Sequence, residues 1–245
     1  MKAYTKNVQK SIAVQNNLSN FAPQNLRPMA KHGEWRDEYW LMLMHIYLSN
    51  PVGVKPLYSR MMVDLSMELH ISPQALQARM RQLARLQTPR IEQLWNTYSK
   101  DKNRLARAVR LLRSMNGFGA ADQFYEGVEV QETFEKEFRP VDGSKVTPAM
   151  LVIILNLYFQ LTPATMVSST PEVKDLAKML RIDTGEVVQV LDIYQACDPY
   201  LNRDEVIVSP LLLPCKQVWQ RLGNHEPNEI QEYANELQEY FMRRE

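Results

Sequence analysis

Glutamine and arginine side chains recur along one side of the segment Pro73–Leu86. On a helix, which advances 100° per residue, Leu76, Met80 and Leu83 share an apolar side. The polar side chains lie opposite, with Ala78 among them: Gln74, Gln77, Arg81 and Arg85. Arginine can donate two hydrogen bonds to guanine, and glutamine can pair with adenine. The pattern predicts a helix that reads base edges in the major groove of DNA, with its N-terminal residues Gln74 and Gln77 nearest the bases.

A second arginine-rich segment runs from Lys102 to Met115. Its predicted helix has Leu105, Val109 and Leu112 on the core side, and arginines spread over the rest: Arg104, Arg107, Arg110 and Arg113. Guanidinium groups at this spacing suit phosphates, and such contacts position a protein on DNA without specifying sequence. For both segments, a plain solvated face or a surface for a protein partner remains an open alternative.

Side chains that could support catalysis or hold a metal are scattered. The four histidines lie far apart in the sequence: His32, His45, His70 and His225. No glycine-rich phosphate loop, GxSxG or HExxH motif occurs. The carboxylates Glu132, Glu135 and Glu137 are predicted to be a solvated charge run. We therefore expect no enzymatic activity, no metal site and no cofactor.

The elements that must position the two arginine-rich segments are helices. Ser72 suits an N-cap and Pro73 the first helical position, where a missing N–H costs nothing. A helix from about Leu57 to His70 precedes this turn, so Val63–Leu83 has a helix-turn-helix pattern. Residues 128–130 and 205–209 are only mildly strand-like. Further helices are predicted at about 37–49, 89–98, 102–115, 148–161, 171–181, 183–196, 215–222 and 227–243.

The chain repeats itself at an offset of 111 residues. Tyr47 falls on Tyr158, and no gap is needed over the next 35 positions or so. Gln93-Leu94-Trp95 matches Gln217-Val218-Trp219 after about 13 extra residues. Such repetition predicts a tandem architecture. The predicted fold is all-α, with two helix-turn-helix-containing domains of about five helices each.

The two halves carry opposite charges, although the whole chain has a net charge of only +1. Residues 38–115 hold 12 Lys and Arg against 5 Asp and Glu, whereas residues 149–245 hold 8 against 14. Either the front half faces a polyanion, or the halves pack on each other. We predict four parts: a polar basic arm (1–36), a basic domain (37–116, the front half), an acidic connector (117–146) and an acidic domain (147–245, the back half).

The back half does not repeat the exposed stripe of the front half, which comprises Gln74, Gln77, Ala78, Arg81 and Arg85. The positions that match the front stripe are Gly185, Val188, Gln189, Asp192 and Ala196, which include no cation. The last predicted helix adds four carboxylates: Glu229, Glu232, Glu236 and Glu239. Facing phosphates, these carboxylates would repel the DNA. The back half is expected to serve self-association or contact with a partner protein.

Composition predicts an intracellular setting. The longest apolar run, Met150–Leu155, is too short to span a membrane, and the N-terminus lacks the apolar core of a signal peptide. Cys197 and Cys215 form no CxxC pair and are expected to stay reduced. We expect a cytoplasmic protein without membrane contact.

The back half resembles a known family segment. Leu151–Phe159, Pro171–Leu180, Tyr194, Asp198-Pro199 and Trp219 are similar to the helical region N-terminal to the nuclease domain of some bacterial HNH restriction-type endonucleases. The resemblance covers residues 148–222, and 38–98 more weakly. It implies a helical fold that helps to recognise DNA. Two features depart from the family: residues 1–245 contain no nuclease part, and the turn reads Arg181-Ile182-Asp183 instead of a Gly-Arg-Ser/Thr type.

Two hypotheses follow from the sequence. In the first, the chain is a non-catalytic DNA-binding protein, a regulator or specificity-type module. It contacts DNA through the front half and assembles through the back half, and a nuclease could then reside on another chain. In the second, it is a protein–protein adaptor or oligomerisation protein without nucleic-acid contact.

Overall fold

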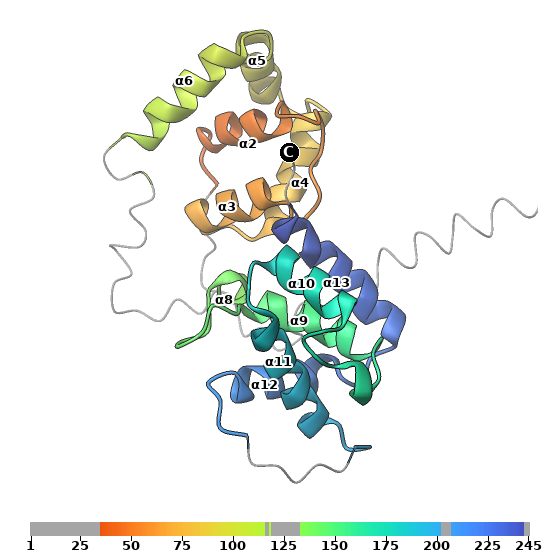
Figure 1. The fold of residues 1–245 in the computed structure, drawn as a ribbon. Helices are drawn as coiled ribbons and strands as arrows, with labels where there is room; N and C mark the ends of the chain where they lie inside the picture. Colours follow the sequence, from red (N-terminus) through yellow and green to blue (C-terminus); the bar gives the residue numbers. More distant parts are fainter. Residues whose placement is uncertain (1–34, 116–117, 119–132, 202–206, 243–245) are drawn as a thin grey trace, which may run out of the picture. The chain divides into compact units, whose positions relative to one another are not determined.

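The described part of the chain is all-helical. The computed structural model describes residues 35–115, 118, 133–201 and 207–242, and from Trp35 onward these belong to one compact unit. They contain eleven α-helices, one short 3-10 helix and no strand. Those of the front half are α2 (Tyr39–Tyr47), α3 (Arg60–Leu69), α4 (Pro73–Ala84), α5 (Pro89–Tyr98) and α6 (Lys102–Arg113). The others are α8 (Thr133–Phe138), α9 (Pro148–Tyr158), η2 (Pro163–Thr165), α10 (Pro171–Leu180), α11 (Thr184–Cys197), α12 (Leu212–Leu222) and α13 (Pro227–Phe241), as Figure 1 shows.

Side-chain caps set the starts of several helices. The Ser72 hydroxyl accepts a hydrogen bond from the Ala75 N–H, and Pro73 occupies the first turn, as predicted. Asp183 accepts from the backbone of α11, and the carboxylate of Glu186 accepts from the Asp183 N–H, so these two residues form a capping box. Thr88, Asp101 and Thr147 cap α5, α6 and α9 in the same way. These local bonds satisfy N–H groups that have no partner within the helix.

Helix ends differ more from prediction. Helix α4 ends at Ala84 and not at Leu86, because Leu86 adopts a left-handed backbone with φ of 48°. The Leu86 N–H then bonds to the Leu83 carbonyl, and the Gln87 N–H bonds to the Gln82 carbonyl. These bonds close the last turn and stop the helix.

Helix α12 begins at Leu212, three residues before the predicted start at Cys215. Pro214 lies in its first turn, where the missing N–H leaves no hydrogen bond unmade. Of the two strand-like segments, residues 207–209 form no strand. Outside the described residues lie 128–130 and 202–206, together with most of the predicted arm and connector.

Helix α2 lies at the centre of the front half. It packs against α4, α5 and α6, and Met42, Leu43 and Met44 are almost inaccessible. Met62 on α3 is also fully buried, whereas 39% of the surface of Met61 is exposed.

Helix α9 has the same place in the back half. It packs against α10, α11, α12 and α13, and all residues from Ala149 to Tyr158 are buried. A helix that is apolar on all sides must be enclosed by its neighbours. The Tyr194 hydroxyl on α11 donates a hydrogen bond of 2.9 Å to the Leu151 carbonyl and so ties these helices together.

The two halves keep the offset of 111 residues in their geometry. Both bounds of α10 lie 111 residues after those of α3. His70 and Arg181, at the same offset, end these helices with left-handed backbones (φ of 53° and 58°). The Tyr47 and Trp95 rings meet edge to face at 5.8 Å, as do Tyr158 and Trp219 at 5.6 Å.

The connector contains a helix that contacts both halves, which the sequence did not predict. On α8, Glu135 is buried; its carboxylate lies 2.7 Å from His70 Nδ1 and accepts a hydrogen bond from Arg139. The Glu137 carboxylate accepts from Arg221 and Tyr233 of the back half. The predicted solvated run is therefore wrong for Glu135 and Glu137, because both carboxylates are paired within the fold; Glu132 lies outside the described residues.

Burial makes the two cysteines poor nucleophiles. Both are free, and burial raises the pKa of the Cys215 thiol to about 12 and also raises that of Cys197. The thiolate is the reactive form. At mildly alkaline pH we expect Ellman's reagent to label Cys197 slowly, and Cys215 only after denaturation. Rapid reaction of both thiols in the native protein would contradict this assignment.

Candidate nucleic-acid interface

Helix α4 presents the predicted stripe on its outer side. Leu76, Met80 and Leu83 are fully buried against α2 and α3, as the spacing required. On the opposite side, Ala78, Arg81 and Arg85 are exposed. Neither Arg81 nor Arg85 makes an ion pair with a carboxylate of the described residues. These two guanidinium groups can therefore meet an external anion.

The two glutamines of the stripe already have partners. The Gln74 amide donates a hydrogen bond of 3.2 Å to the Tyr58 hydroxyl. Half-buried Gln77 donates to the Lys55 carbonyl at 3.3 Å, and its own carbonyl accepts from Arg81 at 2.9 Å. The structure thus places segment 55–58 beside the N-terminal half of α4. Gln74 and Gln77 would have to exchange these partners before they could pair with bases.

A buried lysine holds that segment in place. Only 3% of the Lys55 surface is exposed, and its ammonium group donates hydrogen bonds to the carbonyls of Ser49 and Pro51. Its backbone N–H lies 3.2 Å from the sulfur of Met80, on the buried side of α4. Sequence reasoning missed Lys55 because a lone lysine in a loop is usually solvated.

The turn before α4 is fixed from outside the front half. His70 adopts the left-handed conformation between α3 and α4, and the Ile71 N–H bonds back to the Ser66 carbonyl. The His70 ring contacts Glu135 on α8. Since His70 and Ser72 together set the direction in which α4 leaves the turn, α8 supports the placement of the stripe.

Helix α6 carries the second set of arginines. Leu105, Val109 and Leu112 are buried as predicted, and Arg104, Arg107 and Arg110 are exposed. The Arg104 guanidinium lies 5.2 Å from the centre of the Tyr98 ring, and Arg107 donates to a carbonyl of its own helix. Arg113, in contrast, donates two hydrogen bonds of 2.7 Å to Glu68 on α3. Arg113 is therefore a structural residue.

Helices α4 and α6 each pack on α2 (Figure 1), and no hydrogen bond or ion pair among the described residues joins them. The structure thus supplies two basic surfaces on separate helices. The first comprises Gln74, Gln77, Arg81 and Arg85, and the second comprises Arg104, Arg107 and Arg110.

The matching side of α11 in the back half has a different character. Asp192 is exposed at the position of Arg81, and its carboxylate accepts a hydrogen bond from Gln195. Gln189 donates to the Ser209 hydroxyl, and Val188 is half-buried. This face carries no cation that could contact a phosphate.

Within the described ranges, no group of three or more His, Cys, Asp or Glu side chains is placed to hold a metal ion. The helices in the same ranges are also too short or too polar to cross a membrane. No protein-family model, curated protein or solved structure matches this chain.

Proposed function

We propose that this chain is a non-catalytic DNA-binding protein that contacts duplex DNA through α4, with α6 on the sugar–phosphate backbone. The observation that carries the proposal is the exposed pair Arg81 and Arg85, which lies beside Ala78 and faces no described carboxylate. A small residue beside two arginines allows close approach to a groove, and arginine forks suit guanine acceptors.

The turn between α3 and α4 supports a helix-turn-helix function. Its left-handed His70 and capping Ser72 let α4 follow α3 after only three intervening residues. In proteins of this class the second helix enters the major groove. Because Gln74 and Gln77 are hydrogen-bonded to segment 55–58, the proposal assigns base reading first to Arg81 and Arg85.

The back half serves assembly in this proposal. We infer that the two halves are a tandem repeat whose binding side diverged, because the helix bounds and the Tyr–Trp contact keep their register while Arg81 is matched by Asp192. We further propose that residues 148–222 share the helical fold of the region before HNH nuclease domains, as expected for a repeat of DNA-recognition type.

The test is the binding of the full chain to a labelled duplex, followed by fluorescence anisotropy. Each phosphate neutralised contributes about −0.9 to the slope of log K against log salt. If Arg81, Arg85, Arg104, Arg107 and Arg110 all contact DNA, we expect a slope of about −4 to −5 between about 0.05 and 0.2 M salt. A slope near zero, or no binding at the lower salt concentration, would reject the proposal.

A protein–protein adaptor is the second candidate. The observation in its favour is that Gln74 and Gln77 are occupied within the chain, while α3 and α13 already pack on each other across the halves. Sedimentation velocity at the same salt concentrations separates the candidates. A salt-sensitive oligomer without DNA affinity would favour the adaptor.

A further inference from the structure

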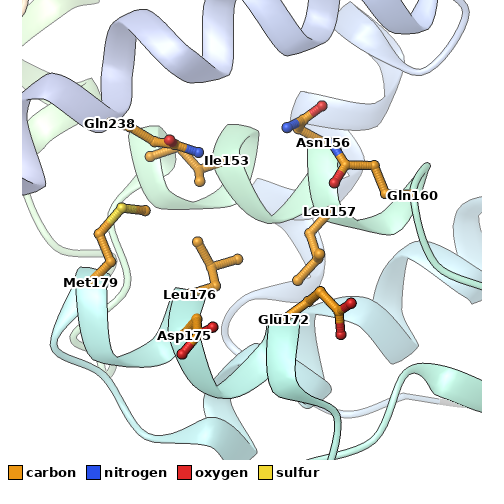
Figure 2. Close-up of a pocket in the computed structure, with 9 residues that line it drawn as sticks. All are labelled: Ile153, Asn156, Leu157, Gln160, Glu172, Asp175, Leu176, Met179 and Gln238. Atoms are coloured by element: carbon orange, nitrogen blue, oxygen red, sulfur yellow. The ribbon is translucent and has the colours of Figure 1, made fainter.

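The back half contains a surface cavity of about 250 Å³ between α9, α10 and α13. Figure 2 shows its apolar walls, which are Ile153 and Leu157 on α9 and Leu176 and Met179 on α10. Pockets for drug-sized molecules exceed about 300 Å³, so this one suits a group as large as a single side chain.

Hydrogen-bonding groups surround these walls. The amides of Asn156, Gln160 and Gln238 line the cavity, and the exposed carboxylates Glu172 and Asp175 line its α10 side (Figure 2). Amide and carboxylate oxygens accept hydrogen bonds, and both carboxylates favour a positive charge. The wall chemistry therefore suits a donor-rich cation with an apolar stem.

Asn156 is the most buried of the polar side chains that line the cavity. It is the one polar side chain on an otherwise apolar part of α9, and only 8% of its surface is exposed. Its amide has no hydrogen-bond partner among the described residues, and what remains accessible of it lines the cavity. Its accessible amide can therefore hydrogen-bond to a polar group that enters the cavity.

The front half shows what fills the matching space. At the offset of 111, Asn156 corresponds to His45 and Met179 to Glu68. The buried residues of α6 correspond to those of α13 at an offset of 125 residues: Leu105 to Ile230, Val109 to Ala234, and Leu112 to Leu237. Gln238 therefore corresponds to Arg113.

In the front half, Arg113 reaches from α6 to α3 and binds both oxygens of Glu68. Burial lowers the pKa of the His45 ring, and the nearby positive charge of Arg113 lowers it further. A guanidinium thus occupies the front space. Just after α2, the Ser49 hydroxyl lies 3.5 Å from the sulfur of Met61 on α3.

In the back half, the arginine and its glutamate are replaced by Gln238 and Met179, and the space is open. Gln160 and Glu172 take the positions of Ser49 and Met61, which adds a carboxylate at the rim. Compared with the matching space in the front half, the cavity lacks a guanidinium group of this chain and has additional hydrogen-bond acceptors.

We propose that this cavity binds an alkyl guanidinium, namely an arginine side chain supplied by another protein. Asn156, Gln160 and Gln238 accept from its N–H groups, Glu172 and Asp175 balance its charge, and the apolar walls cover its methylene stem. Arginine suits the site better than lysine because its planar group offers five donors and is weakly hydrated. The protein source follows from the front half, where the occupant is a protein arginine. This inference does not rest on DNA binding.

The probe is arginine capped by acetyl and N-methylamide groups, titrated into the full chain and followed by NMR. We expect saturable shifts of the Asn156 and Gln238 side-chain amides and of the Met179 methyl group, with a dissociation constant on the order of 1 mM, as befits one side chain. Capped lysine should bind several-fold more weakly. Free arginine should bind no more tightly than capped arginine, because its α-ammonium and α-carboxylate groups add no net charge and the site contacts only the side chain.

Two variants test the assignment. Met179→Glu with Gln238→Arg rebuilds the front ion pair inside the cavity and should abolish binding. Glu172→Gln with Asp175→Asn changes only exposed side chains, so the fold should persist while affinity falls about tenfold, for the loss of two charges near the ligand. Its matched control, Asp142→Asn with Glu232→Gln, makes the same change of net charge at other exposed positions and should bind as the parent does.

The proposal is overturned by an absence of saturable shifts, or by equal loss of affinity in the Glu172/Asp175 variant and its control. Tighter binding of free arginine than of capped arginine would overturn the protein source, since it would indicate a small-molecule site. None of these results depends on DNA, so failure here is distinct from failure of the proposed function.

Discussion

Replacing Arg81 and Arg85 together by alanine is expected to weaken the binding of duplex DNA by about 1–3 kcal/mol for each arginine that reads a base. Both side chains are exposed, and Arg81 donates to Gln77 on its own helix, so the variant should fold as the parent does. If both groups also neutralise phosphates, the slope of log K against log salt should become less negative by about 2. Fluorescence anisotropy on a labelled duplex measures both quantities.

The α6 arginines provide the comparison. Changing Arg104, Arg107 and Arg110 to alanine should lower affinity to a similar degree on every sequence, because phosphates carry no sequence information. Lys174→Ala with Lys178→Ala is the charge-matched control, since both lysines are exposed on α10 of the back half. If this control weakens binding as much as the α4 variant does, the contact surface is not α4.

Helix starts were predictable because their causes are local. Ser72 with Pro73, and Asp183 with Glu186, satisfy backbone donors within one turn of the chain, so the sequence alone locates α4 and α11. The buried sides were equally predictable from spacing, as Leu76, Met80 and Leu83 illustrate. Amphipathic periodicity carries that information without reference to any partner helix.

The environment of the predicted stripe was not predictable from α4 alone. Gln74 and Gln77 match base readers in type and spacing, yet their partners are the Tyr58 hydroxyl and the Lys55 carbonyl, 16 and 22 residues earlier. Glu135 matches a solvated carboxylate, yet it is paired with His70, 65 residues away. Contacts at such separations depend on how loops and helices pack, which a helical projection does not represent.

The cavity beneath Asn156 left a weak trace in the sequence. At an offset of 111, Glu68 becomes Met179, which signals that an ion pair is absent. The second part of that signal is Arg113 matched by Gln238, and it requires an offset of 125. The segment before α12 adds about 13 residues to the offset of 111, and the turn between α12 and α13 adds one more. Only the packed helices reveal which residue of α13 stands where Arg113 does.

Phe138→Ala is expected to destabilise the protein by about 3–5 kcal/mol, the usual cost of removing a buried phenyl ring. Phe138 on α8 is buried, and its ring lies 5.9 Å from that of Tyr58 in the front half and 5.0 Å from that of Tyr240 in the back half. Since one side chain contacts both halves, its loss should also weaken their coupling. We expect urea unfolding, followed by tryptophan fluorescence, to change from one transition into two.

Tryptophan positions allow the two transitions to be assigned. Trp40 lies in the core of the front half, with Trp35 and Trp95 packed against it, and Trp219 lies in the back half. A Trp219→Phe background therefore reports on the front half. Phe159→Ala is the matched control. The Phe159 ring is 37% exposed and stacks on Trp219 at 5.9 Å, and its ring contacts among the described residues are all with the back half. It should cost about 1 kcal/mol and leave a single transition, as expected for a partly exposed residue. If Phe138→Ala also retains one transition, the halves are held together by the α3–α13 contact, and α8 does not couple them.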